Sequence, residues 1–147
     1  MGQAKVSGAL SPEEALNQVG FVIHQAKGYS MQPFIHSGDT VIVSRTSERL
    51  KKYDIALYKA WDQYIIHRCI SVRKNDYVFA GDHNTFKEPG LTDDQILGVV
   101  VKILRGRQEV PLTGWRYRLY CHLWVDFFPL RSFIIKAKKV FRRSDAP

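Results

Sequence analysis

The chain of 147 residues is poor in cysteine and has no long hydrophobic run. Its two cysteines, Cys69 and Cys121, are 52 positions apart, which fits neither a disulfide framework nor a metal-finger spacing. No stretch approaches the roughly 18 apolar residues of a membrane-spanning helix, and the first ten residues lack the core of a signal peptide. There is no phosphate-binding glycine loop either. The sequence predicts a cytoplasmic protein without cofactor or metal, with at most a peripheral contact on the inner face of a membrane.

Acidic residues become scarce in the last third of the chain. Residues 1–100 contain 11 Lys and Arg against 11 Asp and Glu, whereas residues 101–147 contain 11 against 3. The net charge of +8 therefore comes from the C-terminal region. A basic region of this kind is typical of proteins that meet lipid headgroups or nucleic acid, but a solvated basic tail has the same composition.

The order of the local patterns predicts a mainly β fold. Ser11 and Pro12 begin a helix that we expect to run from about residue 12 to 26. Between residues 28 and 110, short β-branched segments alternate with turns, which is typical of a small antiparallel barrel. The expected strands are 40–43, 54–58, 64–72, 77–80 and 96–104, and residues 81–94 form a polar loop. We thus predict a helical segment (1–27), a β domain (28–110) and a basic helical appendage (111–147).

The appendage has the pattern of two amphipathic helices. Trp115, Leu119, Leu123 and Phe127 recur every four residues, and a second apolar stripe follows Pro129. Basic side chains flank this second stripe, and we expect them to contact an anionic membrane surface: Arg131, Lys136, Lys138, Lys139, Arg142 and Arg143. Packing of both helices on the barrel explains the stripe equally well. The confinement of basic residues to these helices argues against nucleic acid as the partner.

Three residues in the β domain have the chemistry of a hydrolytic site. Ser30 lies between Gly28 and Pro33, in a bent segment where its hydroxyl is accessible and the backbone amides of Ser30 and Met31 can form an oxyanion hole. His67 lies in a strand and can accept a proton at neutral pH. Asp82 follows a strand, where it can orient an imidazole.

Each of these residues has a plain structural explanation when it is taken alone. A serine near glycine and proline is usually a turn residue, a strand histidine usually a satisfied core or rim residue, and an aspartate after glycine usually a turn former. Cys69 is on the same strand face as His67, but a strand cysteine is usually a buried apolar residue. A zinc site from His67, Asp82, His83 and Glu88 lacks any recognised ligand spacing.

The joint occurrence of three motifs resembles a known family. The segments GYSMQPFIHSGDTVIV, YIIHRCI and YVFAGDHN resemble the signal peptidase I and LexA-like superfamily of serine peptidases, the S24/S26 group, from about Lys27 to Leu104. The resemblance implies a LexA- or signal-peptidase-like β-barrel. It also implies that Ser30 is the nucleophile, and that His67 replaces the lysine base of the bacterial enzymes, as in the endoplasmic reticulum and archaeal signal peptidases.

The same resemblance implies an acid partner for the histidine. Asp82 matches the acidic residue of the Ser-His branch, and Glu88 or Asp94 matches the second acid that some members use. We therefore predict a serine endopeptidase that cleaves a leader or signal-like peptide, with Ser30, His67 and Asp82 as catalytic residues. The alternative is a non-catalytic peptide-binding or membrane-surface module that retains the fold.

Overall fold

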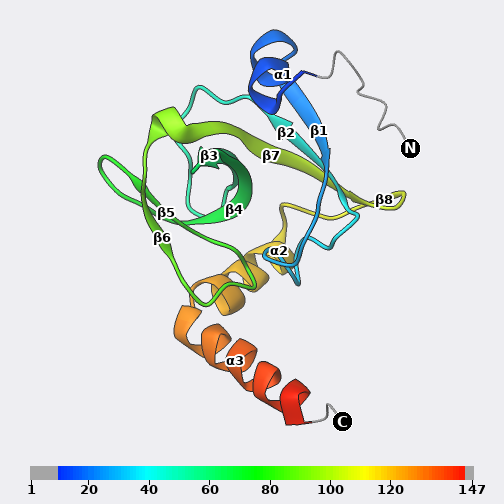
Figure 1. Ribbon diagram of the computed structural model, residues 1–147, viewed down its shortest axis with the longest axis vertical. Coiled ribbons are helices and arrows are strands. Elements are labelled where there is room, and N and C mark those ends of the chain that lie inside the picture. The colour runs from blue at the N-terminus through cyan, green and yellow to red at the C-terminus, as the bar shows by residue number, and fades with distance from the viewer. Residues whose placement is uncertain (1–9, 145–147) are drawn as a thin grey trace, which may run out of the picture.

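The computed structural model describes residues 10–144, which form a curved antiparallel sheet with helices at its two ends (Figure 1). All strand pairs are antiparallel, in the order β1-β2-β7-β3-β4-β5-β6, and β8 adds to β7. The elements are α1 (Pro12–Gln18), β1 (Phe21–Gln25), β2 (Thr40–Ser44), β3 (Ile55–Ala60), β4 (Gln63–Val72), β5 (Tyr77–Ala80), β6 (Glu88–Leu91), a 3-10 helix (Asp93–Gln95), β7 (Ile96–Arg105), β8 (Gln108–Glu109), α2 (Trp115–Tyr120), a π-helix (Cys121–Val125) and α3 (Phe128–Ser144). The expected mainly β fold with terminal helices is confirmed.

The start of the first helix agrees with its expected signal, but its end does not. Ser11 and Glu14 form a reciprocal capping box, with distances of 2.8 Å from Ser11 N to Glu14 Oε2 and 3.2 Å from Glu14 N to Ser11 Oγ. The expected extension to residue 26 is wrong. The helix ends at Gln18, Gly20 adopts a φ of 88°, and the chain enters β1, where Val22 pairs with Val43 of β2. Residues 21–25 therefore belong to the sheet.

The polar loop expected at 81–94 is also partly wrong, because Glu88–Leu91 forms β6 at the edge of the sheet. Pro89 lacks the N–H that a central strand requires, and an edge strand tolerates this loss. As a result, Glu88 is fixed on the sheet instead of moving with a loop.

Two apolar clusters pack against the sheet, and alternate residues of β3 contribute to each of them. One contains Leu16, Met31 and Ile35 together with residues of β2, β3 and β7, so it joins α1 and the segment after β1 to the sheet. The other contains Tyr58, Cys69 and Phe79 and lies under β3, β4 and β5. Both clusters contact strands that position the predicted site residues.

The C-terminal helices lie at the opposite end of the molecule from α1, and α3 projects away from the sheet (Figure 1). No helix within residues 10–144 is both long enough and apolar enough to span a bilayer.

Candidate active site

Ser30 lies in the connection between β1 and β2. Gly28 adopts a φ of 79°, a conformation that side chains disfavour, and this turns the chain back after β1. Met31 and Ile35, one and five positions after the serine, are 6% and 4% exposed, so they anchor the segment in the core while Ser30 stays half-buried at the surface. Within the described residues, the amides of Ser30 and Met31 donate no backbone hydrogen bond, which leaves them available to an oxyanion.

His67 lies in the middle of β4, opposite Ala56 of β3. The residue is 6% exposed, and its Nδ1 atom is 3.1 Å from Glu88 Oε2 and 3.1 Å from the Tyr58 hydroxyl oxygen. The Tyr58 hydroxyl also donates a short hydrogen bond to Glu88 Oε2. Since these partners occupy Nδ1, Nε2 is the ring nitrogen that remains for a proton transfer.

The carboxyl of Glu88 is held in its ionised form. Burial alone favours the protonated form, but hydrogen bonds from His67 and Tyr58 outweigh it and keep the pKa of Glu88 below its ordinary value. Burial and the Glu88 carboxylate both raise the pKa of Tyr58, so this phenol stays neutral and acts as a donor. The three side chains thus form a fixed network on one side of the imidazole.

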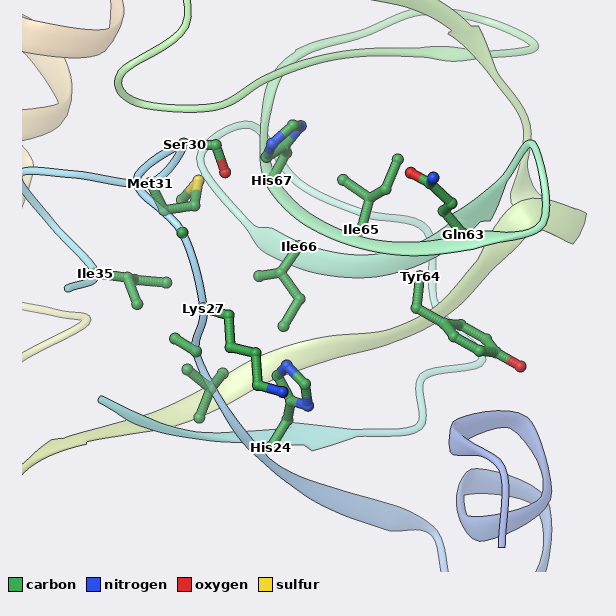
Figure 2. A pocket seen from close by; sticks show the side chains of 13 residues that line it. His24, Lys27, Ser30, Met31, Ile35, Gln63, Tyr64, Ile65, Ile66 and His67 are labelled. Carbon is green, nitrogen blue, oxygen red and sulfur yellow. The ribbon is translucent and has the colours of Figure 1, made fainter. Parts of the chain in front are cut away.

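Ser30 and His67 line the same cleft, of about 490 Å³. Figure 2 shows them as neighbours at one end of it, with the serine hydroxyl on the side of the imidazole. In the described part of the chain the Ser30 hydroxyl makes no hydrogen bond. The rest of the lining is His24, Ala26, Lys27, Gly28, Met31, Ile35, Val41, Gln63, Tyr64, Ile65 and Ile66.

The structure does not bring Asp82 to the imidazole. Its carboxylate accepts two hydrogen bonds from Arg68, Nε to Oδ1 at 2.9 Å and Nη2 to Oδ2 at 2.8 Å, and a third from the Tyr120 hydroxyl at 2.8 Å. Arg68 and Asp82 are both fully buried. The expectation that Asp82 orients His67 is therefore corrected: Glu88 is the acid at the imidazole, and Asp82 neutralises a buried arginine.

The Asp82 loop contacts the backbone of Ser30. The His83 amide donates to the Ser30 carbonyl oxygen at 2.8 Å, and a Cβ on Gly81 would be 2.5 Å from that same oxygen. Only glycine fits at position 81 without displacing Ser30. The GDHN motif thus has a positional role next to the site, even though Asp82 does not touch the histidine.

Two other candidates lie away from the imidazole. Asp94 is exposed on the 3-10 helix, and its carboxylate accepts a short hydrogen bond from Thr92. Cys69 is completely buried in the second cluster, and burial raises the pKa of its thiol to about 12, which is unsuited to a nucleophile. Among residues 10–144, no group of three or more His, Cys, Asp or Glu side chains is arranged to hold a metal ion.

Two contacts at the candidate site were not foreseen from the sequence, namely that of Tyr58 with Glu88 and that of Arg131 with the Asp82 loop. Arg131, expected at a membrane surface, is 1% exposed, and its Nη2 donates to Gly81 O at 3.0 Å and to Asn84 O at 3.3 Å. The expectation for this residue is wrong. No local pattern distinguishes Arg131 from its exposed basic neighbours, because its burial depends on how α3 packs against a distant loop.

A serine and a histidine in one cleft of a curved antiparallel sheet, with a carboxylate hydrogen-bonded to Nδ1 of the imidazole, are typical of the class of serine peptidases. A family model described as Peptidase S24-like matches residues 9–101, which is more than half of the chain. The chain belongs to this family. No curated protein matches the chain.

Proposed function

We propose that the protein is a serine endopeptidase in which Ser30 is the nucleophile and His67 the general base. Ser30 Oγ attacks a peptide carbonyl carbon while His67 Nε2 takes the hydroxyl proton. The C–N bond then breaks, and the proton passes from His67 to the leaving amine. Water hydrolyses the resulting ester by the same route and regenerates Ser30.

Glu88 has the orienting role in this mechanism. Its carboxylate holds the proton of His67 on Nδ1, which directs Nε2 to the serine, and it stabilises the imidazolium that forms when the proton moves. The single observation that supports the proposal best is this arrangement, in which one imidazole contacts Glu88 and shares a cleft with Ser30. The amides of Ser30 and Met31 would stabilise the oxyanion.

The substrate would bind as an added strand. β1 is the terminal strand of the sheet, and β4 pairs with β5 only from Arg68 onward, so the segment Gln63–Ile66 has a free edge. Both free edges line the cleft, and an extended peptide can hydrogen-bond to either of them. Met31, Ile35 and Ile66 give the cleft apolar walls, which suits small apolar side chains next to the scissile bond.

We propose a leader or signal-like peptide as the substrate, in line with the resemblance of the Ser-His pair to the endoplasmic reticulum and archaeal signal peptidases. The support for this class is the pairing of apolar cleft walls with free strand edges. The substrate class is independent of the choice of nucleophile and base, so the experiment must test the substrate class and the catalytic mechanism separately.

The test incubates the purified protein with a proteome-derived peptide library supplemented with leader and signal peptides, and detects new termini by mass spectrometry. Wild type should cleave a subset of peptides, and Ser30→Ala should lose at least about a thousandfold in kcat/KM. Ser47→Ala, which removes an exposed hydroxyl outside the cleft, is the matched control and should cleave normally.

Cleavage that persists in Ser30→Ala would refute the mechanism. Peptide binding without cleavage by the wild type would instead favour the non-catalytic binding module. Cleavage restricted to library peptides other than leaders would leave the mechanism standing and overturn the substrate class.

A further inference from the structure

Helix α3 presents an apolar surface to solvent. Leu130, Phe133 and Phe141 are 55%, 70% and 72% exposed. With 100° of rotation per residue, they lie on one side of the helix together with Ile134 and Ala137. We call this set of five residues the apolar face of α3. Leu123 and Phe127, which precede the helix, are also 57% and 55% exposed.

A different side of α3, next to the flank where Lys138 lies, contacts the body of the protein. Arg131 and Ile135, one turn apart, are 1% and 3% exposed. Arg131 donates to the carbonyl groups of Gly81 and Asn84, which fixes the helix on the loop beside the site. Leu130, Phe133 and Phe141 of the apolar face stay more than half exposed, on a helix that projects away from the sheet (Figure 1). The apolar face does not serve to pack the helix on the barrel.

Cations border the apolar face on both sides. On the helical projection Lys136 and Arg143 lie on one flank and Lys138 on the other, and Lys139 and Arg142 complete the basic surface. All five are exposed, α3 contains no acidic residue, and the salt bridges within residues 10–144 involve none of the five. An exposed apolar strip between unpaired cations is typical of helices that lie in the plane of a membrane interface.

We propose that the apolar face of α3 and its flanking cations dock the protein on an anionic lipid surface. Lipid headgroups would neutralise the cations while the aromatic rings enter the acyl boundary. A second copy of this chain is a poor occupant, since it would bring two sets of five unpaired cations together. Nucleic acid would neutralise the cations but leave the apolar face uncovered. The inference concerns a binding surface and does not depend on catalysis.

The first test measures co-sedimentation of the full chain with vesicles of phosphatidylcholine alone or with about 30% phosphatidylglycerol. Binding should require the anionic lipid and fall with added salt. The double variant Phe133→Ser, Phe141→Ser should bind at least about tenfold more weakly. Lys136→Gln, Lys138→Gln, Arg142→Gln should show a similar loss. Phe21→Ser removes an exposed ring at the other end of the molecule and should bind as wild type.

A second test locates the contact within the helix. Cys69 and Cys121 are fully buried, so a thiol-reactive environment-sensitive dye will label an introduced Phe133→Cys selectively. Its emission should shift to the blue on addition of anionic vesicles, whereas the same dye at Phe21→Cys should not respond. This readout distinguishes docking by α3 from nonspecific adsorption of a basic protein.

Three results would overturn the proposal. The first is equal binding of wild type and the Phe133→Ser, Phe141→Ser variant to anionic vesicles. The second is a dimer in light scattering that this variant abolishes, with no vesicle binding by either protein. The third is binding of a single-stranded RNA probe with no binding to anionic vesicles.

Discussion

Two carboxylates that are six positions apart, Asp82 and Glu88, have opposite relations to the site. Asp82 is fully buried and neutralises Arg68, and its loop supports the Ser30 carbonyl. Glu88 lies on the edge strand β6 and contacts His67. Asp82 maintains the structure around Ser30, and Glu88 faces the imidazole. The role of a carboxylate close in sequence to a site motif therefore depends on the side chain that it contacts, and its spacing from the motif does not determine that role.

The largest expected effect is that of Glu88→Gln on catalysis. The amide oxygen can still accept from His67, so the geometry is retained, but the charge that stabilises the imidazolium is lost. We expect kcat/KM to fall by about a thousandfold, with the thermal unfolding midpoint little changed. The exposed acid Asp94 provides the matched control, and Asp94→Asn should cleave normally.

Next in size is the effect of Asp82→Asn on stability. This change leaves Arg68 as an unpaired buried charge, so the free energy of unfolding in urea should fall by about 3 kcal/mol. Adding Arg68→Met should restore much of that loss, because the whole buried pair is then replaced. If Asp82→Asn stays fully stable but inactive while Glu88→Gln remains active, the two acids have been assigned the wrong way round.

A smaller effect is expected for Tyr58→Phe. The change removes the donor to Glu88 but keeps the buried ring, so the carboxylate keeps its contact with His67 but loses part of its support. We expect kcat/KM to fall by about tenfold, well short of the loss in Glu88→Gln. Steady-state kinetics at several pH values will measure this fall in kcat/KM. An equal loss in Tyr58→Phe and Glu88→Gln would contradict the supporting role of Tyr58.

The smallest effect concerns the pH dependence of stability. The pKa of Glu88 is lower in the folded protein than its ordinary value of 4.5. The folded state therefore binds this proton less readily than the unfolded state, so the stabilisation is complete above that ordinary value and is lost as the pH falls through the lowered one. Urea titrations over this acid range should show a steeper fall for wild type than for Glu88→Gln. Parallel curves would contradict the lowered pKa.

Much of the β domain was predictable, because β-branched segments between turn residues identify strands without tertiary information. The expected strands at 40–43, 64–72 and 77–80 agree with β2, β4 and β5 within one residue at each end. The end of α1 at Gln18 was not predictable, since Val22 and Ile23 fit both a helical stripe and a strand. Only their pairing with β2 decides between the two.

At the site, the motifs predicted that Ser30 and His67 lie together, but not which acid serves the histidine. His67 and Arg68 are neighbours on β4, and successive strand residues point to opposite faces, so each needs its own acid. The signal that could have assigned Asp82 is the arginine next to the histidine. A buried guanidinium requires a carboxylate as firmly as a catalytic imidazole does.

Under the proposed function, the hydrogen bonds from Arg131 to Gly81 and Asn84 have a consequence for substrate choice. The projecting helix and Ser30 are held by the same short loop, because this loop also donates to the Ser30 carbonyl oxygen. With the helix seated on lipid, the scissile bond would be reached at one set height above the bilayer. A tethered precursor would then be cut where its spacer length matches that height, so the proposed peptidase would select substrates by spacer length as well as by side chains.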